Sequence, residues 1–184
     1  MRKFELTSET KINIFGKKLF RIKALISFGD VEAGETGGWV EKEGNVNQSG
    51  DAWVFGNAEV SGDARVSGDA RVFGDAEVSD NARVFGNARV FGNARVFGNA
   101  RVFGNARVSG DADYTTIHGF GTQFRTTTFF RCKDKKVRVA CGCFFGTIPE
   151  FREQVKNTRK GKIAEEYLMI ADLMEKHFEV KSNE

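Results

Sequence analysis

Residues 50–115 read GDAWVF-GNAEVS-GDARVS-GDARVF-GDAEVS-DNARVF-GNARVF-GNARVF-GNARVF-GNARVS-GDADYT. These eleven hexads share the form Gly-[Asn/Asp]-Ala-x-Val-[Phe/Ser], although Asp80 replaces glycine in one of them and the last, Gly110–Thr115, is degenerate. An α-helix repeats about every 3.6 residues, so valines six residues apart do not share one face of a helix. A short repeat of this kind predicts a solenoid, in which each unit buries its apolar face only against its neighbours.

Each position of the hexad has a structural role. Alanine and valine are two residues apart, so in a strand they point to the same, inner face, and the residues that flank valine point outward. Glycine followed by Asn or Asp tolerates positive φ, so every hexad ends at a corner. Phe55, Phe73 and Phe91 lie 18 residues apart, as do Glu59 and Glu77, so three hexads make one turn. The repeat therefore predicts a mainly β, three-sided solenoid lined by valine and alanine.

The hexads resemble the hexapeptide-repeat family, and this resemblance implies a left-handed parallel β-helix. The usual crossover rule alone would have favoured the right hand. Segments outside the repeat, among them Gly37-Gly38-Trp39-Val40 and Cys141-Gly142-Cys143-Phe144, resemble phage and prophage proteins. Those proteins are labelled as acyltransferases or as polymer-forming, cytoskeletal-like proteins, so the wider resemblance implies a bacterial host and names no chemistry.

Three parts are expected along the chain. Residues 1–43 form an N-terminal β-hairpin cap, residues 44–115 form the β-helix, and residues 116–184 form a C-terminal α+β unit. The cap hairpin turns at Phe15-Gly16-Lys17-Lys18, and its apolar side chains are Ile12, Ile14, Leu19, Ile22 and Leu25. A solenoid end exposes strand edges and apolar interior, so a cap is expected there.

The C-terminal unit is predicted to hold a hairpin and two helices. Residues 124–132 and 137–143 form its strands, with a turn at Lys133–Lys136. Thr147-Ile148-Pro149-Glu150 fits a capping box with proline in the first turn of a helix. A second amphipathic helix is expected over residues 162–178.

Charge and composition exclude several classes of protein. The chain carries 28 Lys and Arg against 25 Asp and Glu, a net charge of +3. It has no apolar run of about 18 residues, so no membrane helix is expected. Three cysteines are an odd number, which disfavours a disulfide framework and favours a reducing cytoplasm. We expect no cofactor, because the glycines are corners of the coil and form no phosphate-binding motif.

The outward positions predict a binding surface. One side of the prism alternates arginine with aromatic residues and is the expected interface: Trp53, Phe55, Arg71, Phe73, Arg89, Phe91 and Arg107. A second side is a secondary interface: Arg65, Arg83, Phe85, Arg101 and Phe103. The third side begins acidic and carries Glu59, Glu77, Arg95, Phe97 and Asp113. The rings also shield their own coil by stacking. We expect a non-enzymatic assembly protein that forms a dimer or trimer and that binds a host protein, for instance one of antiviral defence.

Two alternatives remain open. Acyltransferases of the resembled family use a histidine with acyl-CoA as donor, and His118, just past the last hexad, is the candidate base. The Arg and Phe faces also suit nucleic acid, but the repeat has seven Arg against nine Asp and Glu, a net charge of −2. We expect no metal site, because Cys132, Cys141 and Cys143 lack the spacing of paired zinc ligands.

Overall fold

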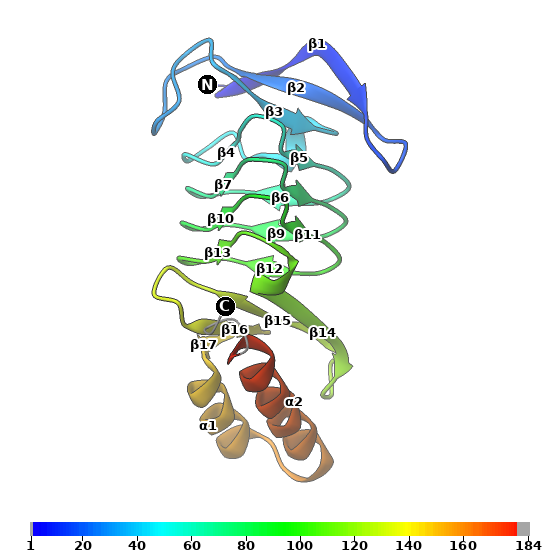
Figure 1. Cartoon of the computed structure of the whole chain (residues 1–184), viewed down its shortest axis with the longest axis vertical. Coiled ribbons are helices and arrows are strands. Elements are labelled where there is room, and N and C mark those ends of the chain that lie inside the picture. Colours follow the sequence, from blue (N-terminus) through cyan, green and yellow to red (C-terminus); the bar gives the residue numbers. More distant parts are fainter. Residues whose placement is uncertain (1, 180–184) are drawn as a thin grey trace. The chain divides into compact units, whose positions relative to one another are not determined.

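The computed structural model describes residues 2–179 (Figure 1). The chain divides into two compact units, Met1–Asp111 and Ala112–Glu184, and each is described by itself. The first unit holds the N-terminal strands together with the coils of the repeat. The second unit holds an antiparallel sheet and two helices. No helix of residues 2–179 is both long enough and apolar enough to cross a lipid bilayer.

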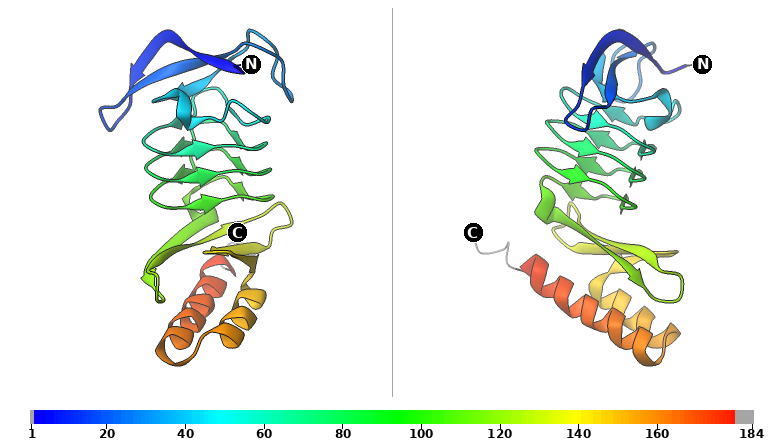
Figure 2. Two further views of the ribbon diagram at one scale, coloured as in Figure 1. Left: turned by 180° about the vertical axis from the view of Figure 1, so that it is seen from behind. Right: turned by 90° about the vertical axis from the view of Figure 1, so that its right-hand side faces the viewer.

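The hexads form a three-sided parallel β-solenoid, which confirms the predicted fold class (Figures 1 and 2). Each strand is two residues long. They are β4 (Trp53–Val54), β5 (Glu59–Val60), β6 (Arg65–Val66), β7 (Arg71–Val72), β8 (Glu77–Val78), β9 (Arg83–Val84), β10 (Arg89–Val90), β11 (Arg95–Val96), β12 (Arg101–Val102) and β13 (Arg107–Val108).

Pairing between coils confirms the period of 18 residues. Arg71 is in register with Arg89, and Arg89 with Arg107, on parallel strands. The three walls are β4-β7-β10-β13, β6-β9-β12 and the row β5-β8-β11. Hydrogen bonds run along each wall, for example from the amide of Arg71 to the carbonyl of Ala88 at 2.9 Å. The ladder therefore joins each coil to the next.

Valine and alanine fill the interior, as predicted. Every valine from Val54 to Val108 and every alanine from Ala52 to Ala106 is fully buried. The corners need positive φ: Gly74 has φ +72°, and a Cβ there would lie 3.0 Å from the amide nitrogen of Gly92. Glycine is required at this corner both for its dihedral angles and for the close approach of the next coil.

The N-terminal strands extend one wall of the solenoid. β1 (Phe4–Ile12) and β2 (Lys18–Ala24) form the predicted hairpin, and β3 (Thr36–Val40) joins β2 to β5. The first coil is longer than the others, because Trp39 pairs with Glu59 at a separation of 20 residues. Leu19 and Ile22 are fully buried, as expected for a cap, but Ile12, Ile14 and Leu25 are exposed.

The second unit is larger than the predicted hairpin and two helices. Its antiparallel sheet has the order β14 (Tyr114–Phe120), β15 (Arg125–Arg131), β16 (Val137–Cys141) and β17 (Phe144–Thr147). The predicted hairpin is the central pair, and β14 and β17 were not predicted. Both helices are confirmed, as α1 (Ile148–Thr158), which begins at the Thr147 capping box, and α2 (Gly161–Glu179).

Phe129, Phe151, Tyr167 and Met174 belong to the core of the second unit. Asp113 is a correction, because the sequence placed it on the third side of the prism. It lies instead in the short helix Asp111–Asp113 and pairs with Arg131 at 3.6 Å.

Candidate binding surfaces

The outer sides of the solenoid are named after one strand of each wall. The β7 side carries the residues next to Val in β4, β7, β10 and β13. The β9 side carries those of β6, β9 and β12, and the β8 side those of β5, β8 and β11. The sides therefore hold the three residue sets that the 18-residue period predicted, apart from Asp113.

The β7 side presents a column of phenylalanine beside a column of arginine. The rings of Phe73 and Phe91 are stacked with centroids 5.0 Å apart and an interplanar angle of 5°. The guanidinium of Arg71 lies 6.0 Å from the ring centroid of Phe55. All three rings are half-buried, and Arg89 is exposed. Stacking covers the facing sides of the Phe73 and Phe91 rings, which supports the shielding role expected from sequence.

Trp53 is not available as an interface residue, contrary to the prediction. It is fully buried, because its ring packs edge-on against Phe4 at 5.8 Å and Phe28 at 5.3 Å. Both neighbours come from the N-terminal segment, whose fold over this wall the hexad pattern did not reveal. Asp30 in the same segment bonds to Arg71, and that hydrogen bond lowers the pKa of the Asp30 carboxyl. The open part of the β7 side therefore lies in the coils that follow Trp53.

The β9 side has a shorter ring column than the β7 side, beside an arginine column of the same length. Phe85 and Phe103 stack with centroids 4.6 Å apart at 5°, and Arg101 lies 5.7 Å from both centroids. Arg65, Arg83 and Arg101 are all exposed. A groove of about 770 Å³ lies along this side, with Arg65, Ser67 and Phe85 in its lining.

The β8 side is charge-compensated. Glu59 pairs with Lys11 at 2.7 Å, and Glu77 pairs with Arg95 at 3.4 Å. A hollow of about 420 Å³ lies here, lined at its apolar parts by Phe15 and Phe97.

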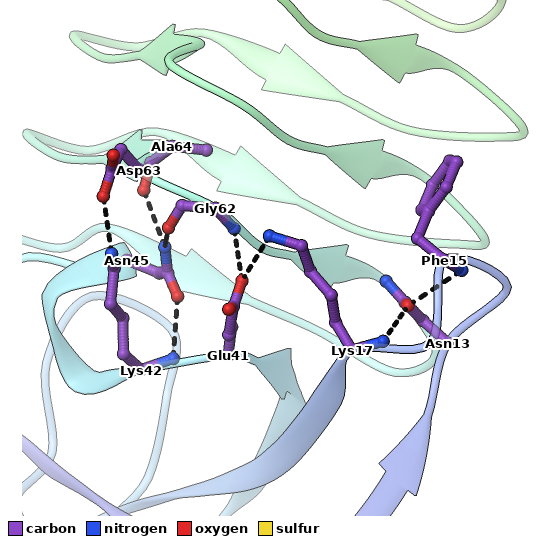
Figure 3. Close-up of polar contacts among 9 residues, drawn as sticks. All are labelled: Asn13, Phe15, Lys17, Glu41, Lys42, Asn45, Gly62, Asp63 and Ala64. Atoms are coloured by element: carbon purple, nitrogen blue, oxygen red, sulfur yellow. Dashed lines mark hydrogen bonds and ion pairs between the residues drawn. The ribbon is translucent and has the colours of Figure 1, made fainter.

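Polar contacts hold the tip of the N-terminal hairpin against this side (Figure 3). Lys17 bonds to Glu41 at 3.1 Å, and the same carboxylate accepts the amide of Gly62 at 2.5 Å. The bond from the Gly62 amide is the main cause that lowers the pKa of Glu41. The side chain of Asn13 accepts the amides of Phe15 and Lys17, which fixes the turn.

Sequence reasoning missed the exposed apolar tip of the hairpin. Ile12, Ile14 and Phe15 are 64%, 73% and 62% exposed, although isoleucine at 12 and 14 was expected to cap the coil. Their position beside a Gly-containing turn was the available signal, because turn residues lie at the surface.

Sequence reasoning also missed the side chains that end the first coil. Nζ of Lys3 donates to the carbonyls of Gly50 and Ala52, at 3.0 and 2.8 Å. Nδ2 of the Asn45 side chain donates in the same way to the carbonyls of Gly62 and Ala64, at 3.1 and 2.9 Å (Figure 3). At the third corner Arg21 donates to the carbonyl of Gly56 at 3.1 Å. Each of these carbonyls thus accepts a side-chain donor in the place where carbonyls of later coils accept a backbone amide of the preceding coil.

His118, the candidate base of the acyltransferase alternative, lies on β14 in the second unit. It is exposed, and its Nδ1 lies 3.2 Å from the hydroxyl of Thr126. The cavity of that unit, about 110 Å³, is lined by Arg125, Cys141 and Tyr167 among others, and His118 is not in its lining. The geometry therefore does not bring His118 into this cavity.

The three cysteines are free thiols in different surroundings. Cys132 is buried, Cys141 half-buried and Cys143 exposed. Burial raises the pKa of the Cys132 thiol to about 11. Within residues 2–179 no group of three His, Cys, Asp or Glu side chains is placed to share a metal ion.

Comparison with known proteins supports the solenoid. A family model described as the YdcK β-solenoid repeat matches residues 64–80, 88–102 and 100–112, all within the run of hexads. The chain is thus similar to that repeat over part of its coils. No curated protein matches the chain. The phage origin and the acyltransferase resemblance stay predictions.

Proposed function

We propose that this protein is a binding and assembly module that associates with a second copy of itself through the β7 side. The observation that carries this proposal is the parallel stack of Phe73 and Phe91 beside the exposed guanidinium of Arg89. Aromatic residues and arginine are enriched in protein interfaces and dominate their hot spots. A rigid wall presents them without a large ordering cost.

The charges of the β7 side favour a second copy as the occupant. Arg89 is exposed on the wall, and exposed Asp69 and Asp75 lie at the two corners of the preceding coil, on either side of Arg71. One surface therefore holds both the cations and the carboxylates that a symmetric contact requires. In a two-fold interface each patch meets its own counterpart, so arginine of one copy can face the corner carboxylates of the other. Arginines stacked at strand spacing repel one another, and such pairing offsets that repulsion.

The resemblance to phage and prophage proteins extends the proposal to a partner from a bacterial host. A host protein would use the same ring edges and guanidiniums that a second copy covers. Self-association is the part that can be tested with the purified chain alone.

Light scattering on a size-exclusion column, over a hundredfold range of protein concentration, tests self-association. The expected result is a mass of twice 20.4 kDa at high concentration, which falls as the protein is diluted. Added salt should shift the midpoint to higher concentration, because exposed ion pairs are screened. A constant mass of one chain at every concentration contradicts the proposal.

A further inference from the structure

On the β9 side the ring column ends at Phe85 and does not extend into the coil of β6. Phe85 and Phe103 stack at 4.6 Å, and the next position in the column is Ser67, whose amide bonds to the carbonyl of Val84. Successive coils are about 4.8 Å apart, which is close to the stacking distance of planar rings. A serine side chain is too small to cover the face of Phe85 that points toward it. One stacking position is therefore open, and both Phe85 and Ser67 line the groove there.

The arginine column runs directly beside this open position. Arg65 and Arg83 are in register on neighbouring strands, and both are exposed. Among residues 2–179 neither guanidinium forms an ion pair, although Arg65 acts electrostatically on the exposed Asp63 carboxylate, which is itself bonded to Lys42 at 2.6 Å. The acidic residue at the end of the groove, Glu43, is already held by Arg2 at 2.5 Å and by Gln48 at 2.7 Å. The groove thus keeps a local positive charge, although the repeat as a whole is slightly acidic.

We propose that this groove binds a nucleoside phosphate. The base stacks on Phe85 above Ser67, and the phosphates are held by Arg65 and Arg83. Planar bases stack on aromatic side chains without regard to sequence, and guanidinium forks bind phosphate oxygens in pairs. The volume of about 770 Å³ is in the range of small-molecule sites.

The spacing of the arginines favours a small phosphate ligand over an acidic peptide. Side chains on one face of an extended peptide recur about every 6.6–7 Å, whereas the arginines recur about every 4.8 Å. Carboxylates of a strand laid along the column would fall out of step with the guanidiniums. Linked phosphates concentrate their charge within reach of two neighbouring arginines. Glu43, Gly44 and residues 46–48 also line the groove beside the first arginine of the column, Arg65.

Calorimetric titration with ADP in magnesium-free buffer tests this site. We expect saturable binding of ADP. Pyrophosphate, which lacks the base, and adenosine, which lacks the phosphates, should each bind about tenfold or more weakly than ADP. Ser67→Phe completes the ring column, so it should weaken ADP binding about tenfold or more while the protein remains folded. Ser79→Phe is the matched control, because Ser79 precedes Phe97 by one coil on the β8 side, and it should leave ADP binding unchanged.

Three results would overturn the proposal. They are the absence of saturable ADP binding at millimolar concentration, equal affinity in Ser67→Phe and the original protein, and tighter binding of a short oligothymidylate than of ADP. The last result would assign the groove to single-stranded nucleic acid. The site is independent of assembly through the β7 side, so the mass of the Ser67→Phe variant should equal that of the unaltered protein.

Discussion

Nζ of Lys3 lies 2.8 Å from the carbonyl oxygen of Ala52, and the lysine side chain is almost fully buried. In the coils that follow, the carbonyl of the equivalent alanine accepts an amide of the preceding coil, as Ala70 does from Trp53 at 3.0 Å. Lys3 thus occupies the place of a backbone amide at the first turn. Its ammonium also lies 4.6 Å from the ring centroid of Phe28, which covers Trp53. The cap and the first coil are joined at this point.

Replacing Lys3 should destabilise the first unit. Lys3→Met keeps most of the apolar stem but leaves the carbonyls of Gly50 and Ala52 without a donor, at a cost of about 2 kcal/mol. Urea unfolding followed by circular dichroism measures the loss. Lys23→Met is the control, because Lys23 is exposed on β2. Removing its ammonium should change the free energy of unfolding by less than about 0.5 kcal/mol.

The same lysine predicts a dependence on pH. Burial lowers the pKa of Lys3 to about 8 from its usual 10.5. Between these values the unfolded chain binds more protons than the folded one, so the free energy of unfolding contributed by Lys3 rises with pH. Below pH 8 both states are protonated and this contribution is at its minimum. The difference in stability between the original protein and Lys3→Met should therefore widen from pH 8 to pH 10; a constant difference would show that the ammonium is not desolvated.

Asp80 is the one corner aspartate in a position that other hexads give to glycine. It has φ +59°, and its carboxylate accepts the amide of Gly98 at 3.0 Å. Asp80→Ala keeps the unfavourable dihedral angle and loses the hydrogen bond, so it should cost about 1–2 kcal/mol. Asp80→Gly loses the bond but relieves the strain, so its stability should stay within about 1 kcal/mol of the original. Chemical denaturation of both variants checks the order, and an alanine variant as stable as the glycine variant would contradict it.

The cysteines should react at separate rates. At pH 7 a thiol with a pKa of about 11 is ionised in about one molecule in ten thousand, so buried Cys132 should react slowly with a disulfide reagent. Exposed Cys143 should give the fast phase, and Cys143→Ser should abolish it. Stopped-flow labelling of the native protein measures both phases. A fast phase that survives in Cys143→Ser would mean that another cysteine is accessible.

The repeat allowed most of the solenoid to be predicted, because each structural feature depends on residues within one hexad or one turn. Val90 is buried because of its place in a strand, and Arg89 meets Arg71 because three hexads close a turn. The helix that starts after Thr147 was equally local, since its capping box lies within four residues.

The failures involve contacts between distant segments. Trp53 follows the same pattern as Arg71, yet it is buried because Phe4 and Phe28 fold over it from the N-terminal segment. Lys3 gave no signal in the sequence, because its role is defined by carbonyls about fifty residues away. The open stacking position above Phe85 depends on which coil carries Ser67, so it required the register between coils.

The measurement that tests the central claim most directly is the mass in solution of Phe73→Glu beside that of Phe97→Glu, at a concentration where the original protein is assembled. Both changes put a carboxylate in place of an outward ring, but Phe73 lies on the β7 side and Phe97 on the β8 side. Assembly through the β7 side predicts that Phe73→Glu falls to the mass of one chain, 20.4 kDa, while Phe97→Glu keeps the assembled mass. An assembled Phe73→Glu protein, with native circular dichroism, would contradict the account.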